Sequence, residues 1–93
     1  MVRPKTKPTD KVEDLLSSFN ELILYNDDIN TFEFVIESLV EVCGHDFEQA
    51  EQCTLVAHYK GRCIVKTGSY NELKGMSDEL TIRKLTVTIE ERD

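Results

Sequence analysis

The chain is poor in several residue types: its 93 residues include no tryptophan, two prolines and four glycines, and its hydrophobic residues form no long run. No stretch approaches the roughly 18–20 apolar residues of a membrane span, so we expect no membrane association. The few glycines form no phosphate-binding loop. Only 11 basic side chains stand against 18 acidic ones, and the net charge of −7 repels nucleic-acid phosphates. The partners we expect are neutral or cationic, and not nucleic acid.

Cysteine is also scarce. Cys43, Cys53 and Cys63 are an odd number, and no secretion signal opens the chain, which predicts reduced thiols and a cytoplasmic location. A zinc site drawn from these thiols with His45 and His58 would lack the C-x-x-C and H-x-x-x-H spacings that concentrate ligands. We therefore expect no metal and no other cofactor. No spacing enforces a cysteine–histidine dyad either, so a small thiol enzyme is a weak alternative.

The chain divides into two parts of different composition. Both prolines and three of the 11 basic residues lie within the first nine positions. We predict a flexible N-terminal extension over residues 1–19, with a short helix over 10–19 as an open alternative. Residues 20–93 are predicted to form one small core domain.

Apolar spacing and capping signals predict six elements in the core domain. The predicted strands are 21–25, 62–67 and 84–90. The predicted helices run from an Asn30 cap to Gly44, from an Asp46 cap to Gly61, and from a Ser69 cap through Leu80. The order β-α-α-β-α-β predicts an α+β sandwich, in which three helices pack on one face of a three-stranded sheet that is antiparallel or mixed.

A polar loop of Asn26, Asp27 and Asp28 links the first strand to the first helix. Helical spacing places further candidates on shared faces of the two following helices, namely Phe32 with Val35, and Thr54 with Ala57 and His58. If these faces meet near the loop, they form an apolar pocket rimmed by an amide, carboxylates and an imidazole. Such a pocket suits an α-ammonium group that carries a large apolar side chain. Ordinary loop and capping roles use the same residue types, so spacing alone leaves both interpretations open.

Three motifs resemble the Clp protease adaptor family, ClpS. They are the run LYNDDINTFEFVIESLVEV, the pattern D-x-E-Q-A at 46–50, and VAHYKGR at 56–62. The resemblance implies an antiparallel three-stranded sheet with three helices. It also implies an adaptor, not an enzyme. Members of the family bind N-degrons, which carry a free α-amino group and a bulky N-terminal side chain such as Leu, Phe, Tyr or Trp. They deliver these substrates to a ClpA- or ClpC-type AAA+ unfoldase that feeds the peptidase ClpP.

The resemblance also implies roles for the residues of the polar loop. Asn26, Asp27 and His58 match the positions that hold the substrate α-amino group. Asp28 matches the last acidic residue of the motif, for which we expect a structural role. Phe32 occupies the position of a methionine that usually gates the pocket mouth.

For the pocket floor, the resemblance implies Val35, Thr54 and Ala57. Thr54 and Ala57 replace a methionine and a valine that are common in the family, which implies a roomier and more polar floor. Glu72 and Lys74 fit the pattern of the unfoldase-binding face best. We expect a monomer. The alternative within this fold is a general protein-interaction domain that regulates an unfoldase without selecting N-degrons.

Overall fold

The computed structural model describes residues 20–92, so the extension predicted over 1–19 and its short helix lie outside the described residues. The elements are β1 (Asn20–Tyr25), α2 (Phe32–Cys43), α3 (Phe47–Lys60), β2 (Arg62–Gly68), α4 (Tyr70–Ile82) and β3 (Val87–Glu91). The predicted order β-α-α-β-α-β is confirmed.

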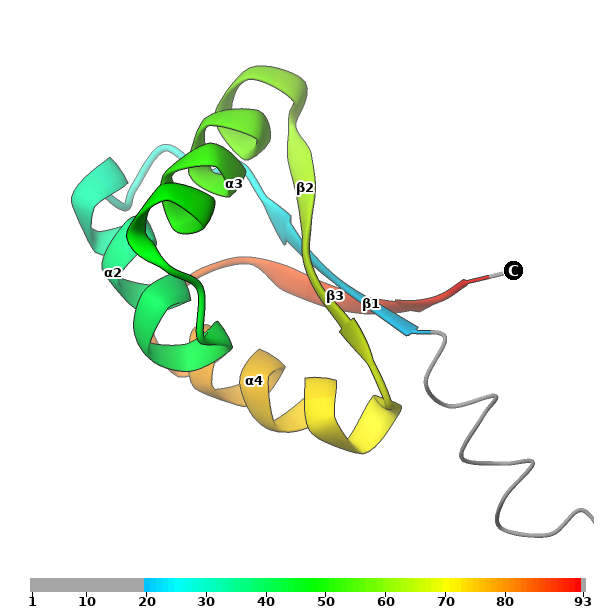
Figure 1. Cartoon of the computed structure of the whole chain (residues 1–93). Helices are drawn as coiled ribbons and strands as arrows, with labels where there is room; N and C mark the ends of the chain where they lie inside the picture. Colours follow the sequence, from blue (N-terminus) through cyan, green and yellow to red (C-terminus); the bar gives the residue numbers. More distant parts are fainter. Residues whose placement is uncertain (1–19, 93) are drawn as a thin grey trace, which may run out of the picture.

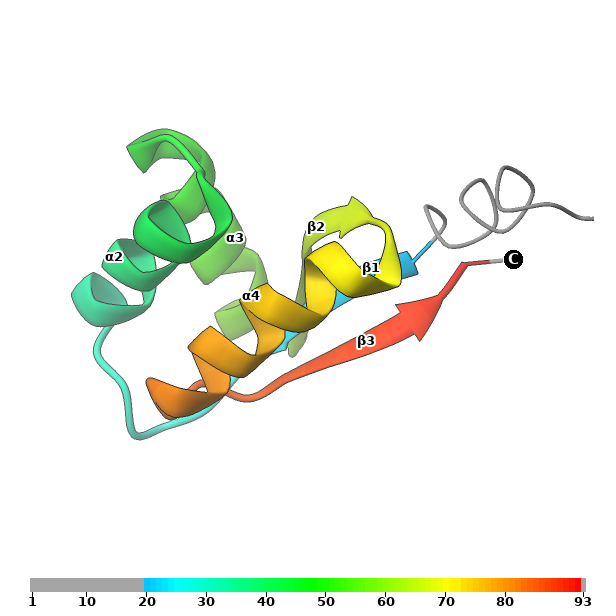
Figure 2. The same cartoon turned by 90° about the horizontal axis from the view of Figure 1, so that it is seen from below.

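The sheet has the strand order β2-β1-β3, and β1 pairs antiparallel with both neighbours. This settles the choice between an antiparallel and a mixed sheet in favour of the antiparallel one. The three helices lie on one face of the sheet, with α2 and α3 side by side and α4 running beneath the strands (Figures 1 and 2). The first strand in the sequence is therefore the central one, and it leads directly into the polar loop.

The N-terminus of α2 differs from the prediction. The cap is Thr31, whose side-chain oxygen accepts a hydrogen bond from the backbone N–H of Phe34 at 3.1 Å, and not Asn30. The side chain of Asn30 is instead used inside the polar loop. The other two predicted caps are confirmed, because Asp46 accepts from Gln49 N–H at 2.7 Å and Ser69 accepts from Glu72 N–H at 3.2 Å.

The last strand begins at Val87, three residues later than predicted. The cause lies at Lys84, which has a positive φ of 74°, so the chain turns there before it can enter the sheet. Leu85 then donates its backbone N–H to the carbonyl of Leu80 at 3.0 Å and is buried against the helices. The alternating pattern over 84–90 thus includes a buried leucine that belongs to the turn after α4.

A β-bulge in β2 explains the buried histidine. Leu22 pairs with Lys66 and Ile23 with Ile64, which leaves Val65 without a cross-strand partner. The Val65 carbonyl is bonded by Nε2 of His45 at 2.6 Å, and since a carbonyl only accepts, Nε2 must carry the proton. His45 is 4% exposed, and its hydrogen bond to Val65 connects the turn between α2 and α3 to the sheet.

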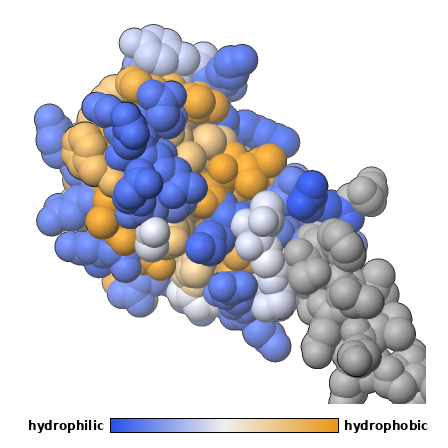
Figure 3. Space-filling view, viewed as in Figure 1, coloured by the Kyte–Doolittle hydropathy of each residue, from blue (hydrophilic) through white to orange (hydrophobic). Residues whose placement is uncertain are grey.

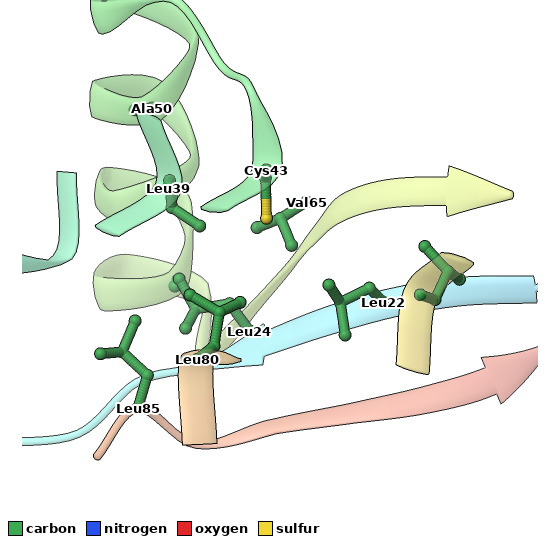
Figure 4. Packing of buried hydrophobic residues seen from close by; sticks show 10 residues of the cluster. Leu22, Leu24, Leu39, Cys43, Ala50, Val65, Leu80 and Leu85 are labelled. Atoms are coloured by element: carbon green, nitrogen blue, oxygen red, sulfur yellow. The ribbon is translucent and has the colours of Figure 1, made fainter. Parts of the chain in front are cut away.

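The core lies between the sheet and the helices. Leu22 and Leu24 of β1 pack with Leu39 of α2 and with Leu73 and Leu80 of α4 (Figure 4). All five side chains are at most 2% exposed. A domain of this size buries a modest fraction of its surface, so each of these leucines carries a large share of the hydrophobic stabilisation.

We expect Leu80→Ala to lower the free energy of unfolding by about 2–5 kcal/mol, because it leaves a cavity in the core. The matched control is Ile82→Ala on the same helix, where the side chain is 74% exposed. This change should shift the free energy of unfolding by less than about 0.5 kcal/mol. Urea denaturation followed by circular dichroism measures both, and equal effects would contradict the assigned core.

Candidate functional site

The site is a small pocket where the end of β1, the polar loop, the start of α2 and the second half of α3 meet. The structure brings together every residue predicted to hold an α-amine or an apolar side chain: Asn26, Asp27, His58, Phe32, Val35, Thr54 and Ala57. Leu24, Tyr25 and Asn30 complete the lining. The loop contributes Asn26, Asp27 and Asn30, whereas the imidazole of His58 comes from α3.

Asp27 organises the polar loop. Its Oδ1 accepts hydrogen bonds from the backbone N–H groups of Ile29 and Asn30, both at 2.9 Å. The side-chain amide of Asn30 also donates to Oδ1 at 3.4 Å and to Oδ2 at 3.2 Å. Oδ1 is therefore occupied by the loop itself, whereas Oδ2 has one protein donor and further acceptor capacity.

The hydrogen bonds of the loop also control the charge of Asp27. Partial burial acts to raise the pKa of its carboxyl group, but the bonds from Asn30 and Ile29 outweigh burial and leave the pKa below its ordinary value of 3.8. The carboxylate therefore stays ionised throughout the neutral and mildly acidic range. Because the pKa is lowered, the stabilisation that the charged form gives the loop is lost only at strongly acidic pH.

Asn30 is a pocket residue that the sequence analysis treated only as a helix cap. Besides its bonds to Asp27, its side-chain amide donates to the backbone carbonyl of Lys84 at 3.0 Å. Asn30 thus ties the polar loop to the turn that follows α4. The only sign of this role in the sequence was the position of Asn30 three residues after Asp27. That spacing is also common in ordinary turns, so it did not indicate a pocket residue.

Asn26 and His58 are two further polar residues that line the pocket. Within residues 20–92, neither the side-chain amide of Asn26 nor the ring nitrogens of His58 form a hydrogen bond. The ring of His58 is flanked by two aromatic rings in edge-to-face contact, Phe32 at 5.0 Å and Tyr59 at 4.9 Å between centroids. Such contacts involve the ring itself and do not use its nitrogens.

The floor of the pocket is narrower than the resemblance implied. Its free volume is about 20 Å³, which accepts roughly one water molecule and not a leucine side chain. The hydroxyl of Thr54 donates to the Ala50 carbonyl at 2.8 Å within its own helix, so its proton is not offered to the pocket. The ring of Phe32 also lines the pocket, lies in edge-to-face contact with His58 and is 38% exposed.

Three other predicted residues lie outside the pocket. Asp28 is exposed at the loop and does not line the pocket. Glu72 and Lys74 are exposed residues of α4 and do not line the pocket. The beginning of α4 lies away from the loop between β1 and α2 in both views (Figures 1 and 2). Lys74 forms an ion pair with Asp78 at 2.7 Å. The candidate unfoldase-binding face and the pocket are therefore separate surfaces.

Two of the three cysteines are poorly suited to nucleophilic chemistry. Burial raises the pKa of the Cys43 thiol to about 11, although Lys66 acts in the opposite direction. Burial, with a hydrogen bond to Cys63, raises the pKa of Cys53 to about 12. These two thiols are therefore protonated at neutral pH and do not supply the thiolate that nucleophilic chemistry requires.

Over residues 20–92, no group of three or more His, Cys, Asp or Glu side chains is arranged to hold a metal ion. In the same part of the chain, every helix is too short or too polar to cross a bilayer.

Comparison with known proteins identifies the family. The sequence profile of the family described as ATP-dependent Clp protease adaptor protein ClpS matches residues 17–88. The chain belongs to the ClpS family. The match includes β1, the polar loop and all three helices, and therefore every residue that lines the pocket.

Similar proteins include ATP-dependent Clp protease adapter proteins ClpS from Citrobacter koseri and Escherichia fergusonii. Each is 44% identical over 57 residues, which cover 59% of this chain and 54% of the relative. The matched segment thus spans about half the length of these relatives. Among solved structures, Agrobacterium tumefaciens ClpS2 bound to L-phenylalaninamide superposes with a TM-score of 0.76 at 21% identity, over 82% of this chain and 99% of that chain. This similarity establishes that the two proteins share the ClpS fold.

We expect Asn30→Ala to loosen the polar loop, because it removes the link between Asp27 and the Lys84 carbonyl. The free energy of unfolding should fall by about 1 kcal/mol, a typical value for lost hydrogen bonds. Amide hydrogen exchange at Ile29, whose N–H is bonded to Asp27, should accelerate. The control is Asn71→Ala on the exposed side of α4, which should leave exchange in the loop unchanged. Unaltered exchange in Asn30→Ala would contradict this role.

Proposed function

We propose that the protein is an N-degron adaptor. It binds the free α-amino group and the bulky hydrophobic side chain of an N-terminal residue, and it delivers such substrates to a ClpA- or ClpC-type AAA+ unfoldase for degradation by ClpP. The observation that carries this proposal is the convergence of Asn26, Asp27 and His58 on one pocket with an apolar floor. The protein itself performs no chemistry in this role.

The rim of the pocket suits an ammonium group. An α-amine has a pKa near 8, so at neutral pH it is mostly charged and offers three N–H donors. The side-chain amide oxygen of Asn26, Oδ2 of Asp27 and a ring nitrogen of His58 are the three acceptors we propose for these donors. Hydrogen bonds to charged groups contribute about 1.5–3 kcal/mol each, enough to reject an acetylated terminus or an internal segment.

The floor suits an apolar side chain only after a rearrangement. Because the free volume is about 20 Å³, a leucine or phenylalanine side chain requires the ring of Phe32 to swing away from His58. An edge-to-face contact contributes about 0.5–1.5 kcal/mol, whereas burying a large side chain yields about 1.5–3 kcal/mol. Burial of the substrate side chain therefore outweighs the loss of the contact between Phe32 and His58. We propose that Phe32 is the gate of the pocket and that Val35, Thr54 and Ala57 form its floor.

The ligand of the related ClpS2 supports this assignment. L-Phenylalaninamide has a free α-amine, a benzyl side chain and an amide in place of a carboxylate, which is the chemistry of the first residue of a peptide. For docking to the unfoldase we propose Glu72 and Lys74, which are exposed on α4 and leave the pocket free to hold its substrate.

The experiment that tests the proposal is fluorescence anisotropy with a peptide that begins with Phe. We expect binding of this peptide, no binding of its acetylated form and none of a peptide that begins with Ser. Asp27→Asn keeps an oxygen for the loop N–H groups but removes the charge, so affinity should fall roughly 10- to 100-fold. The control is Asp28→Asn, which removes the same charge outside the pocket and should change affinity less than about twofold.

Equal effects of the two substitutions would contradict the amine-binding role of Asp27. Binding of the acetylated peptide as tightly as the free one would favour a general interaction domain without N-degron selectivity.

Removal of the His58 imidazole should weaken binding. The variant His58→Ala keeps the side chains of Asn26 and Asp27 but loses one of the three acceptors for the ammonium group, so affinity should fall roughly 10-fold or more. The variant His58→Gln, whose amide oxygen can still accept a hydrogen bond, should lose less. Fluorescence anisotropy with the Phe peptide measures both, and an unchanged affinity of His58→Ala would exclude the imidazole as an acceptor.

A further inference from the structure

A second and larger depression lies between α2 and α3. This groove has a volume of about 510 Å³, against about 20 Å³ for the pocket. Its apolar wall on α2 consists of Phe32, Ile36 and Val40, which recur every fourth residue and so lie along one face. Phe47 and Leu55 of α3 form the opposite wall. Phe47 is 63% exposed, so the groove leaves a large apolar side chain in contact with solvent.

The rim of the groove is acidic. Glu33, Glu37 and Glu41 line it from α2, and Glu51 lines it from α3. Glu41 is paired with Arg83 at 2.8 Å, but within residues 20–92 the other three carboxylates have no ion-pair partner. The helix α2 contains no basic residue at all. In Figure 3, hydrophobic and strongly hydrophilic patches adjoin one another over the part of the molecule formed by α2 and α3.

We propose that this groove is a docking site for a cationic amphipathic helix of a partner protein. The stripe from Phe32 to Val40 covers nine residues and extends over about 12 Å, which matches about two turns of an incoming helix. Apolar residues of that helix at i, i+4 and i+7 fit between the walls, as in other helix-in-groove complexes. Its Lys and Arg side chains extend past the apolar walls and reach Glu33, Glu37 and Glu51.

The groove is distinct from the two surfaces already assigned. It shares Phe32 with the pocket but none of the polar groups that would hold an α-amine. Glu72 and Lys74 on α4 do not line it. Exposed apolar residues with a rim of one charge are a feature of interaction surfaces, and unpaired carboxylates around them select a basic partner.

The test uses a 16-residue peptide, acetylated and amidated, with leucine at helical spacing and lysine elsewhere. Acetylation removes the α-ammonium group, so the N-degron pocket is not engaged. We expect binding with a Kd below about 100 μM at 0.1 M NaCl, measured by fluorescence anisotropy. A peptide of the same composition in shuffled order, which cannot present an apolar face, should bind at least tenfold more weakly. The variant Asp27→Asn should bind the amphipathic peptide like the unmodified protein, which separates this proposal from N-degron recognition.

Matched variants test the location. Glu37→Lys on the rim and Phe47→Ala on the wall should each weaken binding about tenfold or more. Their controls are Glu91→Lys, which makes the same change of charge at an exposed position of β3, and Ile82→Ala, which removes an exposed apolar side chain from α4. Both controls should alter the Kd less than twofold.

Three results would overturn the proposal. One is the absence of binding, and another is an equal loss in Glu37→Lys and Glu91→Lys, which would indicate attraction to net charge alone. The third is a dimer in sedimentation analysis that Phe47→Ala dissociates, because the groove would then be occupied by a second copy of this chain. Circular dichroism of each variant confirms that the fold is retained, as expected for substitutions of exposed side chains.

Discussion

The site depends on a single carboxylate. Asp27 collects the backbone N–H groups of Ile29 and Asn30 and the side-chain amide of Asn30, and it thereby holds five residues in a tight loop between β1 and the cap of α2. In the proposed function the same group receives the α-amine of the substrate. Oδ1 accepts three hydrogen bonds from the loop, whereas Oδ2 has one protein donor, the side-chain amide of Asn30, and keeps further acceptor capacity. If an ammonium group binds to Oδ2, as proposed, the loop needs little further ordering when the substrate arrives.

This loop is rigidly anchored on both sides. It begins at the end of β1, the central strand, where Leu24 is 2% exposed, and the backbone N–H of Asn26 donates to the Gly61 carbonyl at 3.0 Å. It is further bound to the turn after α4 through the Lys84 carbonyl. The core of this domain is small, and the polar loop directly follows β1, the strand with the most buried residues.

Local rules predicted the order of the elements well, because apolar periodicity, the Asp46 and Ser69 caps and the stops at Gly44 and Gly61 act over a few residues. The predicted cap of α2 and the predicted start of β3 were wrong because they depend on more than local sequence. Asn30 satisfies the usual capping rules, but its side-chain amide donates to Asp27 and to the carbonyl of Lys84, 54 residues away. Thr31 is therefore the cap. The alternation that predicted a strand from residue 84 could not reveal the positive φ of Lys84.

For the site, spacing brought the right faces of α2 and α3 together, and the resemblance supplied the proposed roles. Substitution by smaller residues at positions 54 and 57 suggested more space, yet the free volume of the pocket, which the ring of Phe32 also lines, is only about 20 Å³. The acidic groove was also not predicted, although its residues recur at intervals of four. Which face of an amphipathic helix stays uncovered depends on the packing of the whole domain.

Phe32 has one further consequence, because its ring is a wall of both the pocket and the groove. Two ligands that require different positions of one side chain are thermodynamically linked, and the linkage is reciprocal. A helix that holds the ring outward would raise the affinity for an N-terminal residue, and that residue would raise the affinity for the helix by the same factor. A helix that presses the ring against His58 would make the two ligands compete. A single side chain would thus set the sign of cooperativity between two surfaces that have no other lining residue in common.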